Sequence, residues 1–116
     1  MQKEGIKETE DFIKGKMWNI CSNLRPQIRP EQDPVYKKSI HILDRIIKRP
    51  QFFSGRNREV IASSIVYISC IIYNKKVSQS KLSKIGGVSE MSVRNGYRRI
   101  LGDFKLDERR QDIKRT

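Results

Sequence analysis

Four side chains near the carboxyl end of the chain combine charge, hydrogen-bonding capacity and a helical spacing. Over residues 89–104 the apolar residues share one face of a predicted helix, and the opposite face carries Met91, Arg94, Asn95 and Arg98. An arginine can donate two parallel hydrogen bonds to O6 and N7 of guanine, a contact worth roughly 1–3 kcal/mol of discrimination, and a methionine can pack against a thymine methyl group. Met91 and Arg94 are therefore the candidate base-contacting residues.

The elements that must present these side chains form a predicted helix-turn-helix. Ser78 is suited to cap a short helix over 78–86, and the run Gly86-Gly87-Val88 predicts the turn that ends it. Ser89 is suited to cap the following helix over 89–104. This layout places the first turns of the second helix where they can enter the major groove of DNA, which is about 12 Å wide.

The charge balance favours a polyanionic partner. The sequence has 25 Lys and Arg against 13 Asp and Glu, a formal net charge of +12. The positive charge extends from Lys3 to Arg115, which is typical of a folded basic surface. In the alternative interpretation, Arg94 and Arg98 are solvated charges on a helix pair that serves only as a packing unit. The residue pattern alone supports this interpretation and DNA binding about equally. The basic excess favours DNA binding.

Three longer helices are expected before this motif. Apolar residues recur every three or four positions over 8–24 and over 34–48, which indicates two amphipathic helices. The segment 57–73 is apolar on almost every side, as expected of a central helix surrounded by others. Its small residues, which allow close helix packing, are Ala62, Ser63 and Ser64.

The sequence thus predicts one all-α domain of five helices. A chain of 116 residues has the usual size of a single domain. We expect the folded part to span 8–104, after a flexible N-terminal segment 1–7 and before a charged C-terminal tail 105–116.

The sequence predicts no catalytic, metal or cofactor site, and no enzyme. Cys21 and Cys70 lie among apolar residues without the spacing of metal ligands, which indicates buried free thiols. The sole histidine, His41, has no partner at catalytic spacing. The longest apolar stretch, Val60 to Tyr73, is shorter than the ~20 residues that span a bilayer. The charged amino terminus lacks the apolar region of a secretion signal, which favours an intracellular protein.

Three further residues have structural interpretations. Trp18 and Tyr67 occur at helical spacings and are expected in the core. Gly96 lies inside a predicted helix, where glycine costs about 1 kcal/mol relative to alanine. It either permits close approach to another backbone or is a tolerated weakness, and the second interpretation is slightly favoured.

Four runs of residues occur in a recognisable order: Ser54-Gly55-Arg56, Ile61-Ala62-Ser63-Ser64-Ile65-Val66-Tyr67, Ser78-Gln79, and Gly87-Val88-Ser89-Glu90-Met91-Ser92-Val93-Arg94-Asn95-Gly96-Tyr97-Arg98. Together they resemble the second cyclin-like repeat of the transcription factor B family, which includes eukaryotic factor IIB and its archaeal counterpart. The resemblance covers about residues 9 to 107 and implies a five-helix cyclin-like fold. Three shorter runs look closer to the eukaryotic form: Asp11-Phe12, Cys21-Ser22-Asn23-Leu24 and Asp103-Phe104-Lys105-Leu106-Asp107.

The resemblance implies binding to promoter DNA together with TATA-binding protein during preinitiation complex assembly. The helix-turn-helix would read the B recognition element upstream of the TATA box, with Met91 and Arg94 at the family's base-contacting positions. Contacts to the DNA backbone are expected from Arg56, Lys76, Ser78, Ser89, Asn95 and Arg98. Met91 replaces a usual valine and Val77 stands where the family usually has arginine, so the preferred DNA sequence is expected to differ from that of the relatives.

Several alternatives remain open. The sequence shows no zinc ribbon, reader-linker segment or first cyclin repeat, through which the family recruits RNA polymerase and grips TATA-binding protein. We expect a monomeric domain excised from a longer factor, and the alternative is a free-standing accessory regulator. The expected compartment is the nucleus for the favoured eukaryotic form and the cytoplasm for an archaeal one.

The rival from another functional class is a cyclin-fold module that binds proteins. A continuous basic patch on the helices over 34–48 and 89–104 would favour DNA. An exposed apolar groove between the helices over 57–73 and 89–104 would favour a peptide partner.

Overall fold

The computed structural model describes residues 3–53 and 56–104, and within these ranges the backbone is helical without any strand. Five α-helices are present there: α1 (Lys3–Leu24), α2 (Pro34–Ile47), α3 (Arg58–Ile72), α4 (Gln79–Gly86) and α5 (Glu90–Asp103). Two short 3-10 helices, η1 (Pro30–Gln32) and η2 (Pro50–Phe53), were not predicted. The predicted all-α, five-helix fold is confirmed.

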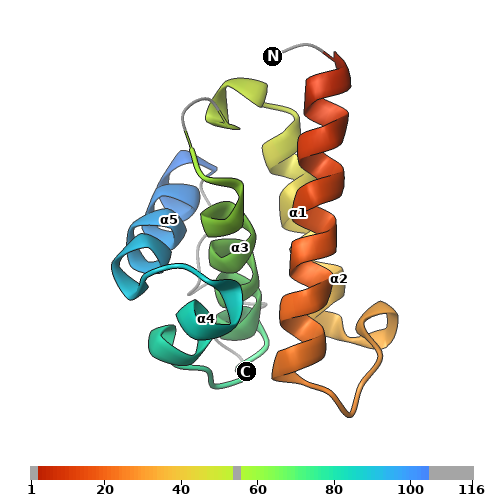
Figure 1. The fold of residues 1–116 in the computed structure, drawn as a ribbon, viewed down its shortest axis with the longest axis vertical. Helices are drawn as coiled ribbons and strands as arrows, with labels where there is room; N and C mark the ends of the chain where they lie inside the picture. Colours follow the sequence, from red (N-terminus) through yellow and green to blue (C-terminus); the bar gives the residue numbers. More distant parts are fainter. Residues whose placement is uncertain (1–2, 54–55, 105–116) are drawn as a thin grey trace.

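Helix α3 is the centre of the fold because it packs against each of the other four α-helices. Figure 1 shows α1 and α2 on one side of it and α4 and α5 on the other. All six residues from Ile61 to Val66 are buried, so α3 is covered on every side over nearly two turns. The prediction of a central helix over 57–73 is therefore confirmed.

Two glycines allow α4 and α5 to lie close to α3. A Cβ atom on Gly86 would overlap Ser63 Oγ. A Cβ atom on Gly96 would overlap Ser64 Oγ and lie 3.1 Å from Val60 Cγ1. The interpretation of Gly96 as a tolerated weakness is wrong, because the contact between α5 and α3 leaves no room for a side chain.

The helix-turn-helix has the predicted caps. Ser78 Oγ accepts a hydrogen bond from the backbone N–H of Lys81 at 2.9 Å, and Ser89 Oγ accepts one from Ser92 at 3.0 Å. Helix α4 ends at Gly86 and is capped by Gly87, whose φ of 72° lies in the left-handed region that favours glycine. The polar and glycine residues of the turn thus fix where α4 ends and α5 begins.

Helix α1 begins at Lys3, before the predicted start at 8. Residues 3–7 therefore belong to a helix and not to a flexible segment. The prediction relied on the apolar spacing alone, whereas Lys7 Nζ and Asp11 Oδ1 lie 3.4 Å apart on the helix surface and Thr9 is buried one turn before the apolar stripe. The predicted tail 105–116 lies outside the described residues.

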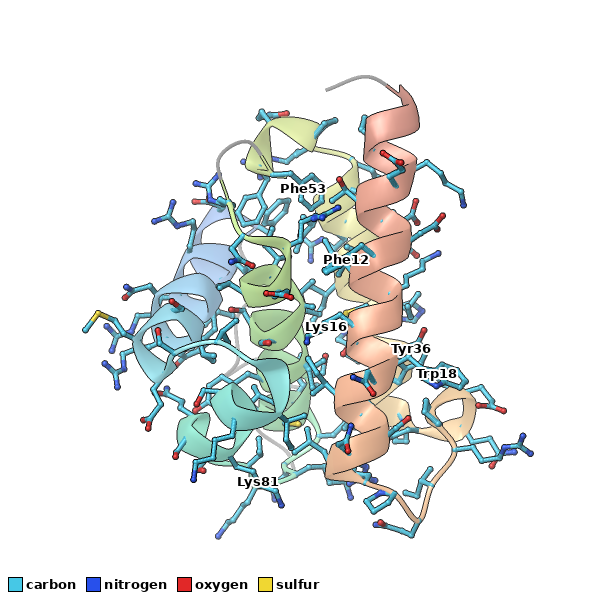
Figure 2. All side chains as sticks on the ribbon, viewed as in Figure 1. Phe12, Lys16, Trp18, Tyr36, Phe53 and Lys81 are labelled. Carbon is cyan, nitrogen blue, oxygen red and sulfur yellow. The ribbon has the colours of Figure 1, made fainter. Side chains whose placement is uncertain are left out.

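Two aromatic residues of α1 lie at the edge of the core, although Trp18 was predicted to lie inside it. Trp18 is 42% exposed and Phe12 is 37% exposed. Trp18 follows the fully buried Met17, and Phe12 precedes the fully buried Ile13. Because one residue along a helix turns the side chain by about 100°, both aromatic rings point away from the centre of the buried face. The Trp18 ring instead packs edge-on against Tyr36 of α2, with centroids 5.5 Å apart (Figure 2). Tyr67, also predicted to be a core residue, is only partly buried.

A buried ion pair connects the loop after α1 to the start of α2. Asp33 is fully buried; its Oδ1 accepts a hydrogen bond from the backbone N–H of Val35, and its Oδ2 accepts one from Arg25 Nε, each at 2.9 Å. One carboxylate thus caps α2 and neutralises the half-buried arginine. The hydrophobic spacing carried no signal for this pair.

Cys21 and Cys70 are buried free thiols, as predicted. Burial raises the pKa of each thiol to about 12, so both are neutral at physiological pH. The part of the chain that the structure describes contains no group of three or more His, Cys, Asp or Glu side chains that could hold a metal ion. It also contains no helix long and apolar enough to cross a membrane.

Candidate nucleic-acid interface

Helices α4 and α5 pack against each other and both pack against α3, so the predicted helix-turn-helix is held as one unit. The inner face of α5 carries the buried Val93 and Ile100. On the outer face Met91 is 63% exposed, and Asn95 and Arg98 are also exposed. Helix α5 thus presents the predicted partner-binding face to solvent.

The two capping serines lie at exposed helix starts. Besides its capping bond, Ser89 Oγ donates a hydrogen bond to Ser92 Oγ at 2.9 Å. Ser78 occupies the matching position before α4. Unpaired backbone N–H groups and the helix dipole make such ends favourable for a phosphate. The structure establishes both serines as caps, and their contact with DNA stays a prediction.

Arg94 is held between α4 and α5 instead of extending freely into solvent. Its Nε donates a hydrogen bond to Gln79 Oε1 at 3.3 Å, and Gln79 Nε2 donates one to the hydroxyl of Tyr67 at 3.4 Å. The Tyr67 ring packs edge-on against Tyr97, with centroids 5.0 Å apart. No role was predicted for Gln79; its place in the first turn of α4, near the helix predicted to contact bases, was the available signal.

A trough along the outer edge of α5 gathers basic side chains from two parts of the chain. Its volume is about 500 Å³, and its lining is Arg56, Asn95, Arg98, Arg99 and Asp103. The structure therefore brings three of the predicted backbone-contacting residues together. Arg99 was missed, because the helical pattern shows only that it is polar and not that a loop arginine lies beside it.

Arg56 is oriented by an aromatic residue of η2. Its Nη1 donates a hydrogen bond to the backbone carbonyl oxygen of Phe52 at 2.6 Å. Its guanidinium group lies over the Phe52 ring, 4.6 Å from the centroid, in a cation–π contact. These contacts fix Arg56 beside α5 although it lies in the loop before α3.

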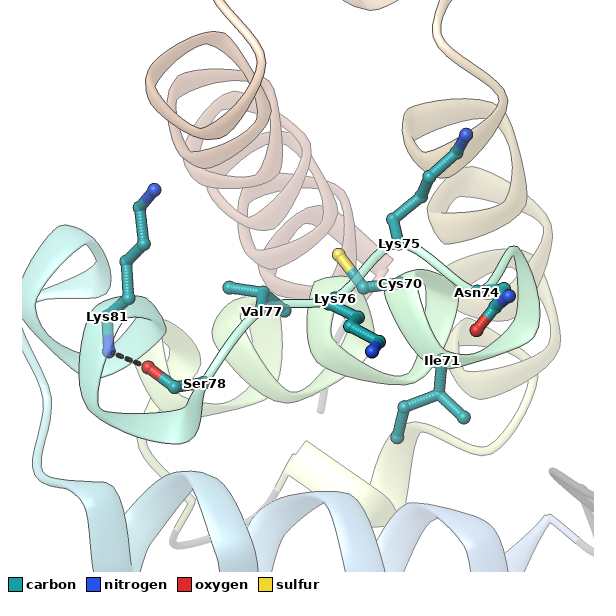
Figure 3. Close-up of a pocket in the computed structure, with 8 residues that line it drawn as sticks. All are labelled: Cys70, Ile71, Asn74, Lys75, Lys76, Val77, Ser78 and Lys81. Atoms are coloured by element: carbon teal, nitrogen blue, oxygen red, sulfur yellow. Dashed lines mark hydrogen bonds between the residues drawn. The ribbon is translucent and has the colours of Figure 1, made fainter.

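A second basic hollow lies at the link between α3 and α4 (Figure 3). Lys76 and Ser78, both predicted backbone contacts, line it together with Lys75 and Lys81, which were not predicted. Val77 lies between them, at the position where the resemblance led us to expect arginine. The predicted backbone contacts are thus divided between this hollow and the arginine trough, with Ser89 at the start of α5.

Basic residues at the end of α2 meet the last turn of α5. Arg45 Nη2 donates a hydrogen bond to the carbonyl oxygen of Phe104 at 2.7 Å, and Arg49 Nη1 donates one to that of Asp103 at 2.6 Å. Positive charge at a helix C-terminus stabilises the otherwise unpaired carbonyl groups. Asp103 also lines the arginine trough, so the carbonyl group that Arg49 contacts belongs to a residue of that trough.

The fold and the site together define an all-α domain of the cyclin-like type that ends in a helix-turn-helix. Residues 8–102 match the family described as Transcription factor TFIIB repeat. The match covers most of the described chain, and the protein belongs to this family. It is a family of transcription factors and not of enzymes.

The curated relatives of this chain include archaeal proteins named transcription initiation factor IIB. That of Saccharolobus shibatae is 25% identical over 72 residues, which are 62% of this chain and 23% of the relative. That of Methanothrix thermoacetophila is 27% identical over 73 residues, 63% of this chain and 21% of the relative. A second factor of Halobacterium salinarum is 38% identical over 48 residues, 41% of this chain and 15% of the relative.

The matched segments thus span 23%, 21% and 15% of the lengths of these relatives. All three are archaeal, whereas several short runs of the sequence look closer to the eukaryotic form. The predicted compartment thus stays a prediction, and so does the assignment to the second of the family's repeats.

Proposed function

We propose that this chain is the second cyclin-like repeat of a general transcription initiation factor and binds double-stranded promoter DNA. In this proposal α5 enters the major groove at a B recognition element, where Arg94 contacts a guanine and Met91 packs against a thymine methyl group. The DNA is bound together with TATA-binding protein during assembly of the preinitiation complex.

The observation that carries the proposal is the composition of the exposed face of α5. Among the large apolar side chains that the structure describes, Met91 is the most exposed at 63%, and it lies one helical turn from Arg94. The exposed Met91 side chain adds no packing to the isolated fold, and beside Arg94 it suits the edges of base pairs.

The flanking charges suit the two DNA backbones that border a major groove. Arg56, Arg98 and Arg99 line the trough along one edge of α5, and the lysines of the hollow in Figure 3 lie on both sides of the start of α4. Each phosphate contact that releases a counterion steepens the dependence of affinity on salt, by about 0.9 in the slope of log K against log salt. The net charge of +12 acts in the same direction.

The partner proteins follow from the family. The relatives are transcription initiation factors IIB and are several times longer than the matched segment. We propose TATA-binding protein as the direct partner and RNA polymerase as a partner through other parts of a longer factor.

The test is fluorescence anisotropy with the 116-residue chain and labelled TATA-box duplexes, with and without an upstream B recognition element. Each duplex is titrated with TATA-binding protein present and absent. Wild type should prefer the duplex with the element, and Arg94→Ala should lose that preference because the guanine contact is removed. The loss should amount to roughly 1–3 kcal/mol, about 5- to 150-fold in relative affinity.

The matched control is Arg29→Ala, which removes the same charge from the loop between α1 and α2, away from α5 in Figure 1. Arg29 is exposed, and its Nε atom lies 3.3 Å from Glu31 Oε2 in a surface ion pair. It should lower the affinity slightly for every duplex and leave the preference unchanged. If wild type shows no preference for the element under any condition, base contact by α5 is refuted.

A protein-interaction module is the second candidate. A groove of about 280 Å³ between α3 and α5 has an apolar floor that includes Val60, Ile61 and Ile100. Its rim carries Arg56 and Arg99, so an acidic peptide would suit it better than an apolar one. Failure of DNA binding in the anisotropy test would favour this candidate.

A further inference from the structure

We propose that Gln79 is a specificity-determining positioning residue, which orients the Arg94 guanidinium group for contact with a base. The proposal rests on the proposed function of α5 and adds a residue of α4 to it. The observation behind it is the hydrogen-bonded chain from Tyr67 through Gln79 to Arg94, which joins α3, α4 and α5.

Chemistry fixes the direction of these hydrogen bonds. Arginine Nε can only donate, so the Gln79 group facing Arg94 must be the carbonyl oxygen Oε1. The Nε2 group of Gln79 then faces the Tyr67 hydroxyl oxygen, which accepts. The side-chain amide of Gln79 therefore has one orientation that satisfies both neighbours.

Tyr67 supports the far end of this chain. Its ring packs edge-on against Tyr97 of α5, at 5.0 Å between centroids and 77° between ring planes. Both rings are partly buried against the hydrophobic core. Tyr67 belongs to α3, which packs against the other four α-helices. Its hydrogen bond therefore anchors the side-chain amide of Gln79 to the central helix of the fold.

The contact through Nε has a consequence for what Arg94 can bind. With Nε engaged by Gln79, the two terminal nitrogens Nη1 and Nη2 are the pair directed at a ligand. This pair matches the O6 and N7 atoms of guanine, which accept two parallel hydrogen bonds. A base without two adjacent acceptors leaves one of these donors unpaired, so fixing the guanidinium group increases discrimination.

Loss of the support should reduce discrimination and leave most of the general affinity. Immobilising a flexible arginine side chain on binding costs about 0.5–1.5 kcal/mol of free energy, which corresponds to about 2- to 12-fold in relative affinity. Gln79 lines neither the arginine trough nor the lysine hollow, so its loss should leave the proposed phosphate contacts there in place.

The experiment measures base preference position by position. TATA-box duplexes carrying a randomised upstream segment are selected by the full 116-residue chain with TATA-binding protein, and the bound pool is sequenced. Comparison of wild type with Arg94→Ala identifies the position where Arg94 selects guanine. Gln79→Ala should then lower the guanine preference at that position about 2- to 12-fold and leave the other positions unchanged.

Three further variants separate positioning from a general structural effect. Gln79→Glu keeps an acceptor for Arg94 Nε and should retain the guanine preference, while its negative charge weakens binding to every duplex. Tyr67→Phe keeps the ring contact and removes the hydroxyl, so it should lower the preference in the same direction and by less. Gln32→Ala, at an exposed glutamine of η1, is the matched control and should behave as wild type.

A direct readout in the free protein is the NMR signal of the Arg94 Nε–H group. It should shift in Gln79→Ala and stay in place in Gln32→Ala. The inference is overturned if Gln79→Ala keeps the full guanine preference while Arg94→Ala loses it. It is also overturned if Gln79→Ala weakens all duplexes equally and lowers the salt slope, because Gln79 would then contact a phosphate itself. If wild type selects no guanine that depends on Arg94, the proposed function fails and this inference fails with it.

Discussion

Replacement of Gly96 by alanine should destabilise the protein, although alanine is the better helix former. Gly96 lies in the middle of α5, where the backbone gains about 1 kcal/mol from alanine. The added Cβ atom would overlap Ser64 Oγ and lie 3.3 Å from Ser64 Cβ and 3.1 Å from Val60 Cγ1. The helix preference and the packing therefore act in opposite directions.

The packing term should be the larger of the two. Inserting a methyl group into a well-packed contact costs about 1–3 kcal/mol. Relief by rotation of Ser64 would also break the 3.4 Å hydrogen bond from its hydroxyl to the carbonyl oxygen of Val93, in a fully buried site. A matched control is Gly102→Ala in the same helix, because a Cβ atom there meets nothing within 4 Å. Gly96→Ala should be less stable than Gly102→Ala by about 1–3 kcal/mol.

The assay is urea unfolding of the full chain, followed by circular dichroism at 222 nm for wild type and each variant. A double-mutant cycle with Ser64→Ala isolates the overlap, since removal of Oγ clears the nearest atom. The second alanine should recover about 1 kcal/mol of the loss. If Gly96→Ala is as stable as Gly102→Ala, the close approach of α5 to α3 does not require glycine and the reasoning is refuted.

Three other perturbations test the interior and the basic hollow. Asp33→Ala should lower the free energy of unfolding, measured with heat or urea, by about 3 kcal/mol, because it removes a helix cap and leaves the half-buried Arg25 without its charge partner. A loss below about 1 kcal/mol would contradict the importance of this buried pair. The thiols of Cys21 and Cys70 should react with a thiol reagent at pH 8 only after unfolding, because burial raises the pKa of each from 9.0 to about 12; their contribution to stability is complete below pH 9 and falls as the pH rises towards 12. Val77→Arg should strengthen DNA binding and steepen the salt slope by about 0.9, since it adds a cation to the lysine hollow, and an unchanged slope would place this hollow away from the DNA.

The predictable part of the fold was that governed by local rules. Helices α2, α3, α4 and α5 begin and end within one or two residues of the predicted limits, because proline, asparagine, serine and glycine at their ends act on the neighbouring backbone. Helix α1 was predicted too short, since its first two turns are polar on most sides and lack an apolar stripe. The position of Trp18 was predicted wrongly. A helical spacing shows which residues share a face of the helix, but it does not show how much of that face the neighbouring helix covers.

For the candidate site, the sequence indicated which side chains point outward and could not indicate what they touch. Met91, Asn95 and Arg98 are exposed as predicted, because their position on α5 follows from the helical period. The hydrogen bond from Arg94 to Gln79 joins residues 15 positions apart on different helices, and no local pattern encodes it.

Local patterns in the amino-acid sequence were enough to predict the helices and most of their limits, the helix-turn-helix, the excess of positive charge and the outward face of α5. These follow from interactions within a few residues of the chain, which short-range spacing and composition express. Three features became visible only in the packed fold: the tight contact of Gly96 with α3, the place of Arg99 beside Arg56, and the hydrogen bond between Gln79 and Arg94. Each of these depends on the distance and rotation between helices, which are set by the packing of the whole core around α3.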